Sequence, residues 1–429
     1  MQKKLLSWLF MGFVVVMASC SKDEDITTAP DVQAEKPNDT LYVNDSITLR
    51  PVISNRNGVN FKWIISGNTV GTDSIYKFKA TESGDFKVVV QATNSIGSGS
   101  DTFNIHVWSK YENGFFILSE GQFLTAAGNL NFYDYGLDSL YINVYSTENP
   151  GSTLGSNTST MEYGAIIDNK FYLVGKYGAP LVTLNPTTLK ETGRIADLPG
   201  SSGRAIVGVT NTQGWLSSVD GIYGVSLAGP ALGLKLATGG GDTRDMLSTG
   251  TYVFALSAAE GVKIFNTADG SVAKTISGAV TGFAAGKDGS IWAASKKALI
   301  RINPSTLAVD SVQAGFDIYY NQWDFVSGSI VASTADDAVF IISGTSVYRY
   351  VPGNTGSLSA PFITLPAGKY FYGKGIAYNK AKNQLIVTAT GNEYGDDNNS
   401  LYFYNASNAA LINTVNYTGY YYPAMIVFH

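Results

Sequence analysis

The sequence predicts an all-β chain in which a small β-sandwich is followed by a ring of seven four-stranded sheets, a β-propeller. Three observations lead to this fold class. Aromatic residues make up 12 % of the chain, with 26 Tyr and 21 Phe, and these residue types favour strands. Short alternating segments are separated by turns rich in Asn and Gly, which is typical of antiparallel sheets. A four-strand unit recurs at a period of about 40–45 residues over the later part of the chain.

The composition excludes several classes of function. Of the 429 residues, 45 % are hydrophobic and 15 % are charged, which indicates a folded core rather than a disordered chain. The net charge is −5 and no long basic run occurs, so no nucleic-acid partner is expected. A single cysteine, Cys20, and two histidines, His106 and His429, are present. These counts exclude a disulfide framework, a Cys or His metal cluster and a histidine-based catalytic triad in the propeller.

Residues 1–19 have the pattern of a lipoprotein signal peptide. Lys3 and Lys4 precede an apolar run from Leu5 to Ala18, which is shorter than the about 20 residues of a membrane-spanning helix. The small residues before Cys20 resemble a bacterial lipobox, and this resemblance implies lipidation of Cys20 and a lipid anchor in the outer membrane. The alternative is a chance cysteine in an ordinary signal peptide.

Residues 20–38 are expected to form a flexible acidic tether. The cluster at positions 21–25, Ser-Lys-Asp-Glu-Asp, resembles the surface-export signal of Bacteroidetes lipoproteins, which implies exposure at the cell surface. From its charges alone the cluster would be a solvated run. The remainder of the segment is polar and has no apolar period, so no strand is predicted there.

Residues 39–108 alternate between apolar and polar positions in short segments that predict a β-sandwich. The expected strands are Ser46–Leu49, Phe61–Ile64, Tyr76–Ala80, Asp85–Ala92 and Thr102–Val107. The run Gly84–Val90, followed by Asn94 and Gly97, resembles the second half of a PKD or immunoglobulin-like domain, with Trp63 as the core tryptophan. Such modules are usually spacers, and ligand binding by this domain is the alternative, because fold alone is poor evidence for function.

Two turns in the later chain are near copies of one another. Asn185–Leu189 reads Asn-Pro-Thr-Thr-Leu, and Asn303–Leu307 reads Asn-Pro-Ser-Thr-Leu. Proline fixes φ at the turn and asparagine can bond to the backbone of the turn. Each copy follows one alternating strand and precedes another, so both are expected to join the two outer strands of a repeat.

A second unit, of two apolar strands and a polar turn, recurs before each outer hairpin. The copies are Gly164–Val174, Ala205–Ser217, Asp245–Leu256, Gly282–Ala293, Trp323–Ala332 and Gly375–Val387. The first repeat begins at Phe115–Ser119 without its inner strand, whereas Ala424–Phe428 is an apolar strand left over at the other end. Pairing of these two segments would close a ring and remove its free edges. The prediction is a seven-bladed propeller over residues 109–429.

Candidate ligand-binding residues lie in the loops that begin each inner strand or join the second and third strands of a blade. Function in propellers gathers on such loops, because the strands are occupied by packing. Aromatic residues there offer flat apolar faces, and charged residues offer orienting hydrogen bonds. Any single aromatic among them is as readily explained by packing between blades. The candidates are Glu120, Phe123, Glu162, Tyr163, Tyr177, Arg204, Arg244, Asp245, Tyr320, Gln322, Trp323, Asp324, Tyr370, Tyr372, Lys374 and Tyr421.

Carboxylates provide the one route to enzyme chemistry that the sequence leaves open. Glu120, Glu162, Asp245 and Asp324 could converge near the ring axis and act as a hydrolase or lactonase, with or without Ca²⁺. Solvated loop carboxylates are the simpler account. Asp396-Asp397 could bind Ca²⁺, but without the spacing of a calcium loop. We therefore expect no catalytic residues, no metal and no enzyme activity.

The segments Gly114–Gly121 and Gly128–Asp134 are similar to the opening blade of YncE-like Bacteroidetes surface propellers. That group includes the BtuG-type lipoproteins that bind corrinoids. The resemblance implies non-enzymatic capture of a small ligand, with cobalamin or another corrinoid as the first candidate, for a TonB-dependent outer-membrane transporter. The alternatives are a glycan-binding propeller, a protein-interaction propeller and the carboxylate hydrolase or lactonase.

Overall fold

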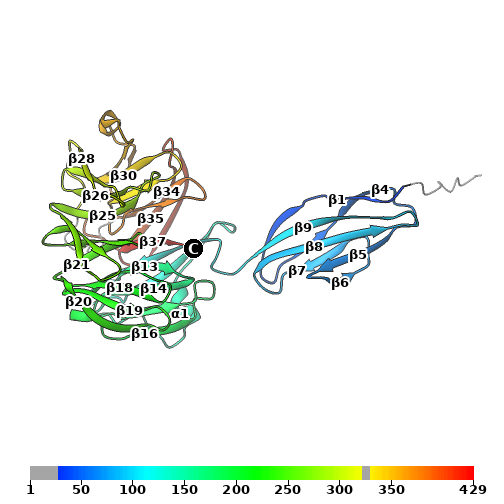
Figure 1. Ribbon diagram of the computed structural model, residues 1–429, viewed down its shortest axis with the longest axis horizontal. Coiled ribbons are helices and arrows are strands. Elements are labelled where there is room, and N and C mark those ends of the chain that lie inside the picture. The colour runs from blue at the N-terminus through cyan, green and yellow to red at the C-terminus, as the bar shows by residue number, and fades with distance from the viewer. Residues whose placement is uncertain (1–27, 321–328) are drawn as a thin grey trace, which may run out of the picture. The chain divides into compact units, whose positions relative to one another are not determined.

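The computed structural model describes residues 28–320 and 329–429. Cys20, the expected lipidation site, lies outside this range. The described chain forms two compact units, one ending at Trp108 and the other running from Ser109 to His429. Each unit is almost wholly β-structure (Figure 1).

The first unit has the predicted sandwich-like fold. A five-stranded sheet, in the order β2-β9-β8-β5-β6, is accompanied by the pairs β1-β4 and β3-β7. β2 pairs with β9 in parallel, and the other pairs are antiparallel. The strands are β1 (Asp31–Ala34), β2 (Asn38–Tyr42), β3 (Ser46–Leu49), β4 (Pro51–Ser54), β5 (Asn60–Ile65), β6 (Asn68–Gly71), β7 (Tyr76–Lys79), β8 (Gly84–Thr93) and β9 (Ser98–Trp108).

Trp63 occupies the centre of the sandwich core. Its side chain is fully buried, its indole N–H donates to the Asp73 carbonyl at 2.8 Å, and its ring stacks on Tyr76 at 5.5 Å between centroids. The sandwich begins earlier than the sequence predicted, because β1 falls in the segment expected as tether. β1 buries one apolar side chain, Val32, and the Ala34 N–H donates to the Asp101 carboxylate at 2.6 Å. One buried residue in four gives no readable period.

The second unit is a β-propeller. Its described residues form seven four-stranded antiparallel sheets. Blades 1 to 3 are β37 (Pro423–Phe428), β10 (Gly114–Ser119), β11 (Asn129–Asp134) and β12 (Ser139–Tyr141); β13 (Thr160–Ile167), β14 (Lys170–Tyr177), β15 (Leu181–Leu184) and β16 (Glu191–Ile195); and β17 (Gly203–Gly208), β18 (Gln213–Ser218), β19 (Gly221–Ser226) and β20 (Ala231–Gly240).

Blades 4 to 7 repeat the same order from the inner strand outward. They are β21 (Thr243–Ser248), β22 (Tyr252–Ser257), β23 (Gly261–Asn266) and β24 (Val272–Ile276); β25 (Ala279–Ala285), β26 (Ile291–Ser295), β27 (Ala298–Ile302) and β28 (Val309–Gln313); β29 (Ile330–Ser333), β30 (Ala338–Ser343), β31 (Ser346–Tyr350) and β32 (Ile363–Thr364); and β33 (Ile376–Asn379), β34 (Gln384–Thr390), β35 (Asn398–Asn405) and β36 (Leu411–Thr418). Short helices α1 (Val144–Glu148), η1 (Pro199–Ser201) and η2 (Thr355–Leu358) lie between strands.

The C-terminal strand closes the ring. β37, red in Figure 1, pairs with β10 in the register Phe115↔Phe428 and Ile117↔Ile426. Each inner strand contacts the next around the ring, and β37 contacts both β33 and β13. The predicted pairing of the chain's last strand with Phe115–Ser119 is therefore confirmed, and it leaves the first blade no free inner edge.

The two near-identical turns join outer strands. The Asn185 side-chain oxygen accepts from the N–H groups of Thr187 and Thr188 at 3.0 and 2.9 Å. The Asn303 side-chain oxygen accepts from the two corresponding N–H groups, at 2.9 and 3.0 Å. These turns link β15 to β16 and β27 to β28, so the asparagine holds the hairpin in the same way in both blades.

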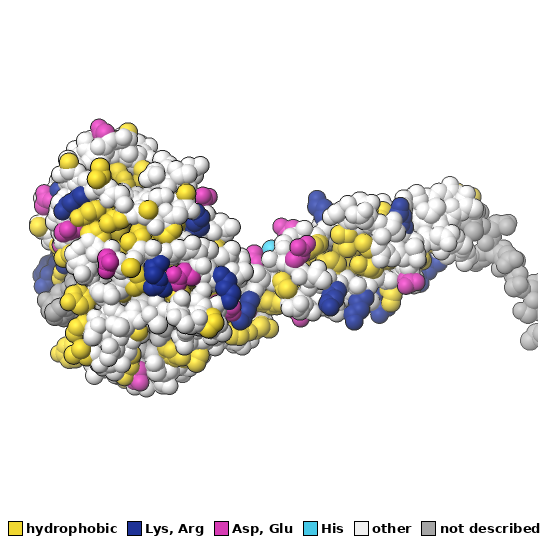
Figure 2. Space-filling view, turned by 90° about the horizontal axis from the view of Figure 1, so that it is seen from below, with side chains coloured by type: hydrophobic (Ala, Val, Ile, Leu, Met, Phe, Trp, Pro, Cys, Tyr) yellow, Lys and Arg dark blue, Asp and Glu magenta, His cyan; other side chains and the backbone are white. Residues whose placement is uncertain are grey.

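The inner strands give the ring two distinct faces. We call the face where they begin the start face and the face where they finish the end face. β13 extends from Thr160 to Ile167, which separates the faces by about 23 Å at about 3.3 Å per residue. On the propeller surface that Figure 2 shows, basic and acidic side chains are interspersed.

Candidate functional site

A cavity of about 550 Å³ opens at the start face. We call it the aromatic pocket. It is built from loops of blades 1, 2, 3 and 7, in the positions that the sequence analysis assigned to ligand contacts. Its lining comprises Glu120, Gly121, Gln122, Phe123, Thr160, Lys176, Tyr177, Gly200, Ser202, Arg204, Val219, Tyr372 and Tyr422. Its volume lies within the range of about 300–1,000 Å³ that is usual for small-molecule sites.

One side of the pocket is fixed by the seam, the paired strands β10 and β37 that close the ring. The Glu120 N–H donates to the Tyr422 carbonyl at 2.7 Å, and the Glu120 carbonyl accepts from the Met161 N–H at 2.9 Å. Gly121 follows with φ of +86°, and a Cβ there would lie 2.6 Å from the Ala126 carbonyl oxygen. Glycine therefore permits the tight turn that places the Glu120 side chain in the pocket floor.

The floor is a buried ion-pair cluster. Lys176 Nζ lies 2.6 Å from Glu120 Oε1 and 3.4 Å from Glu162 Oε2. The side chains of Lys176, Glu120 and Glu162 are 7 %, 11 % and 3 % exposed, and Tyr372 Oη donates to Glu120 Oε2 at 2.9 Å. Burial raises the pKa of Glu120, the Glu162 charge adds to this effect, and Lys176 and Tyr372 oppose it. Two buried carboxylates thus share the single ammonium of Lys176.

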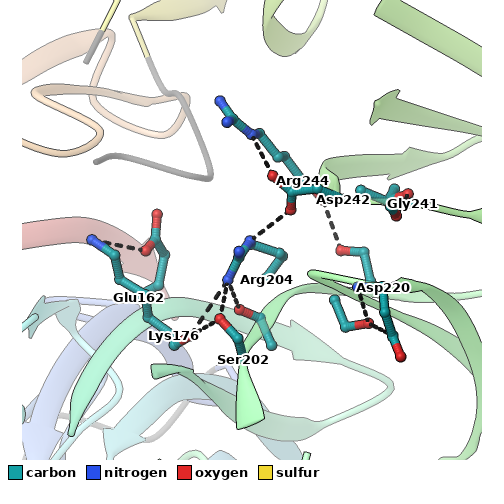
Figure 3. Close-up of polar contacts among 12 residues, drawn as sticks. Glu162, Lys176, Ser202, Arg204, Asp220, Gly241, Asp242 and Arg244 are labelled. Atoms are coloured by element: carbon teal, nitrogen blue, oxygen red, sulfur yellow. Dashed lines mark hydrogen bonds and ion pairs between the residues drawn. The ribbon is translucent and has the colours of Figure 1, made fainter. Parts of the chain in front are cut away.

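Arg204 forms the adjoining part of the floor (Figure 3). Its Nη1 donates to Ser202 Oγ at 2.5 Å and to the Gly203 carbonyl at 3.0 Å. Its Nε pairs with Asp242 Oδ1 at 3.2 Å, and the other oxygen of Asp242 lies 3.4 Å from Arg244 Nε. Burial lowers the pKa of Arg204, while Asp242 and Glu162 oppose that shift. The network fixes the guanidinium plane beneath the pocket.

Aromatic side chains form the walls. Phe123 and Tyr177 meet edge to face at 5.7 Å between centroids and are 49 % and 52 % exposed. Across the pocket, Tyr372 stacks on Tyr422 at 4.8 Å, and Tyr421 packs against Tyr422 at 5.8 Å. Exposed ring faces above a charged floor suit a ligand with an apolar or planar body and polar substituents.

The structure divides the predicted site residues into groups. Glu120, Phe123, Tyr177, Arg204 and Tyr372 line the aromatic pocket. Glu162 contacts Lys176 of the floor, Arg244 donates to Tyr320 Oη at 3.0 Å, and Tyr421 packs against Tyr422. Tyr163, Asp245 and Lys374 line a different cavity, and Tyr370 pairs through its backbone with Thr390. Gln322, Trp323 and Asp324 lie outside the described residues.

Several residues of the pocket are not among the candidates that the sequence predicts. Lys176 is the centre of the ion-pair cluster, and its signal was a charge at the end of the apolar strand β14. Tyr422, rather than Tyr421, lines the pocket and has φ of +57°. Asp242 joins the two arginines. Pairing across blades of this kind has no local sequence pattern.

A calcium site is one alternative that the sequence leaves open. In residues 28–320 and 329–429, no group of three or more His, Cys, Asp or Glu side chains could hold a metal ion. Asp396 Oδ1 accepts the N–H groups of Gly391 and Asn398, both at 3.0 Å, so its own loop uses this carboxylate. No helix within the same ranges is long and apolar enough to cross a membrane.

Of three matches to solved structures, the one with a TM-score above 0.5 agrees with this architecture. The chain is similar to a quinonprotein alcohol dehydrogenase-like protein from Bacteroides thetaiotaomicron, with a TM-score of 0.63, 18 % identity and coverage of 94 % of this chain and 99 % of that one. At this identity the likeness shows the fold alone. This chain also matches the dihydro-heme d1 dehydrogenase NirN in complex with DHE, with a TM-score of 0.44, 10 % identity and coverage of 85 % of this chain and 75 % of that one. A third match is the extracellular domain of a one-component system from B. thetaiotaomicron, with a TM-score of 0.41, 11 % identity and coverage of 89 % of this chain and 66 % of that one.

No curated protein matches the chain. Residues 29–94 match the model of a PKD-like domain, and the first unit therefore carries a PKD-like module. Residues 113–429 match the model described as Domain of unknown function (DUF5074). Since this match covers the whole ring and most of the sequence, the chain belongs to the DUF5074 family, whose domain here is a propeller that follows a PKD-like sandwich.

Proposed function

We propose that the protein captures a small organic ligand in the aromatic pocket and does not transform it chemically. The observation that carries this proposal is the combination of half-exposed rings, Phe123 and Tyr177, with a buried charged floor of Glu120, Lys176 and Arg204. The rings provide apolar contact area and the floor provides directional polar contacts. The resemblance to BtuG-type propellers makes a corrinoid the first ligand to test.

The floor supports binding rather than catalysis. A carboxylate acid–base pair works across a substrate, with separations of about 5–9.5 Å in glycoside hydrolases. Here Glu120 and Glu162 converge on the single Lys176 ammonium, and the Glu162 side chain is 3 % exposed. A substrate would have to break this cluster before it could stand between the two groups. The hydrolase and lactonase alternatives are therefore less well supported.

We also propose that Cys20 carries the lipid anchor and that the protein acts at the outer surface of the outer membrane. Delivery of the captured ligand to a TonB-dependent transporter is part of this proposal. It depends on the sequence around Cys20 and on the acidic cluster that follows it. Radiolabelled palmitate should label the wild-type protein and not Cys20→Ser, and external protease should remove the wild-type protein from intact cells.

Calorimetry tests the ligand proposal. The purified protein, without residues 1–27, is titrated with cobalamin, cobinamide and haem, and then with a panel of oligosaccharides. The expected result is saturable corrinoid binding that Tyr177→Ala or Phe123→Ala weakens about tenfold. Tyr394→Ala is the matched control, since Tyr394 is 79 % exposed and does not line the pocket.

Two outcomes other than corrinoid binding would have different consequences. Binding of an oligosaccharide with the same sensitivity to Tyr177→Ala would replace the corrinoid by a glycan and keep the capture role. Absence of binding throughout both panels, or binding that Tyr177→Ala and Phe123→Ala leave unchanged, would refute the assignment of the aromatic pocket.

A further inference from the structure

A second cavity of about 600 Å³ occupies the channel along the ring axis and opens at the end face. It contains the later residues of three inner strands, such as Ile167 of β13, Val207 of β17 and Leu247 of β21. Thr210 and Ser248 lie at its outer end, past or at the ends of β17 and β21. None of the residues that line this channel also lines the aromatic pocket, although the inner strands β13 and β17 contribute different residues to each cavity.

Apolar side chains form part of the wall of the channel. Ile166, Ile167, Val209 and Leu247 are partly exposed although they lie on or beside inner strands. Phe283 of blade 5 completes the wall. Apolar side chains that stay partly exposed inside a cavity gain from contact with an apolar ligand.

A charged pair marks the inner end of the channel. The Asp245 carboxylate accepts the Met246 N–H at 2.9 Å and the Phe283 N–H at 3.1 Å. Lys374 Nζ lies 3.6 Å from Asp245 Oδ2 and 6.0 Å from the Tyr163 ring centroid. The side chain of Asp245 is 3 % exposed and that of Lys374 is 21 % exposed.

Asp245 and Lys374 differ in how many hydrogen bonds each could still make. Asp245 has two backbone donors and a nearby ammonium, so its oxygens are occupied. An ammonium has three N–H donors, and the ion-pair contact of Lys374 is longer than a hydrogen bond. Lys374 therefore retains donor capacity toward the channel, and the group it can receive there is an acceptor, most favourably an anion.

We propose that the channel is a second ligand site, for a small amphipathic carboxylate. The carboxylate head lies at Lys374, and a compact hydrocarbon body follows the apolar wall toward the end face. This site goes beyond the proposed capture function and does not depend on it, because the two cavities open at opposite faces of the ring.

Matched ten-carbon probes test the proposal. Decanoate, decanol and decyltrimethylammonium are titrated separately into the full propeller-containing protein below their micellar concentrations, and binding is followed by calorimetry. Decanoate is expected to bind saturably and more tightly than either other probe, because only decanoate offers an acceptor anion to Lys374. Equal binding of all three, or no binding of decanoate, would overturn the proposal.

Variants locate the binding site. Lys374→Gln is expected to weaken decanoate about 10- to 100-fold, as the loss of a hydrogen bond to a charged group does, whereas Lys374→Arg keeps most of the affinity. Ile167→Asp, at the wall, should also weaken it by adding a negative charge, and serves if Lys374→Gln does not fold. Lys296→Gln is the control, since Lys296 is 69 % exposed and outside the channel.

Failure of the channel proposal can be distinguished from failure of the proposed capture function. Phe123→Ala and Tyr177→Ala, at the start face, are expected to leave decanoate binding unchanged, and Lys374→Gln is expected to leave binding in the aromatic pocket unchanged. Loss of decanoate binding on Tyr177→Ala but not on Lys374→Gln would place decanoate in the aromatic pocket and refute the channel site.

Discussion

Lys176 is the most informative single residue to change. Its ammonium lies between the buried carboxylates Glu120 and Glu162, at 2.6 and 3.4 Å. Lys176→Met keeps the volume and the apolar stem but removes the charge that both carboxylates face. Loss of one partner of a buried ion pair costs about 3–5 kcal/mol, because the remaining charge is left without compensation. For a unit of this size, about 2.1 cal/mol/K per residue converts that cost into a Tm lower by about 4–8 °C.

The cost should depend on pH in a defined direction. Burial already raises the pKa of Glu120, and Lys176 opposes this, so Lys176→Met raises the pKa further. A carboxyl whose pKa is higher in the folded than in the unfolded state binds more protons when folded, so stability falls as pH rises between the two values. The loss in Lys176→Met should therefore be largest at about pH 8 and smaller at about pH 5, where protonation removes the buried charge.

Calorimetric melting of the wild type and variant over this pH range provides the measurement. Lys296→Met is the matched control, because its partner Asp317 is 54 % exposed and exposed pairs contribute about 0–1 kcal/mol. Lys176→Met combined with Glu120→Gln and Glu162→Gln should recover part of the Tm. A cost for Lys176→Met no larger than that for Lys296→Met, or equal costs at about pH 5 and about pH 8, would show that Lys176 does not compensate the buried carboxylates.

Two further predictions concern the two units. Ile426→Asp places a charge at an 8 % exposed position of β37, next to Phe115 and Ile117, and should destabilise the ring by on the order of 4 kcal/mol; unchanged thermal unfolding and protease resistance would show that β37 does not close it. Trp63→Ala should lower the stability of the sandwich by about 3–5 kcal/mol and leave the melting transition of the propeller in place, and a shift of both transitions by the same amount would contradict independent units.

Much of the ring could be predicted because its repeat leaves local marks. Asn185 and Asn303 open turns that need a side-chain acceptor for the next N–H groups, and the sequence repeats this requirement almost letter for letter. The strand at Phe115–Ser119 has no inner strand before it in the sequence, so it needs a partner from elsewhere in the chain. The last apolar strand, β37, is that partner. Strand β1 was missed because it buries a single residue, Val32.

The site could be predicted only as far as its loops. A strand of known position still leaves two directions for each side chain, and a loop leaves more. Tyr421 and Tyr422 are identical in sequence terms, yet φ of +57° at Tyr422 accompanies its place in the pocket, beside the Tyr372 ring. Arg204 and Asp245 both lie near the starts of inner strands, but one lines the aromatic pocket and the other the axial channel.

The pocket and the closure of the ring depend on the same contacts. Glu120 receives its position from the Tyr422 carbonyl, one residue before β37, and from the Met161 N–H of blade 2. Glu120 therefore takes its place in the charged floor only when the last strand has paired with the first blade. Partial opening of the seam should release Glu120 and Tyr422 together, and ligand binding would then be lost before the ring unfolds. A ligand held in this pocket contacts both sides of the seam and therefore favours the closed ring, as any ligand favours the state that binds it. Ligand-dependent protection of the β37 amide protons from exchange would follow from this coupling, and equal protection with and without ligand would show that the two are independent.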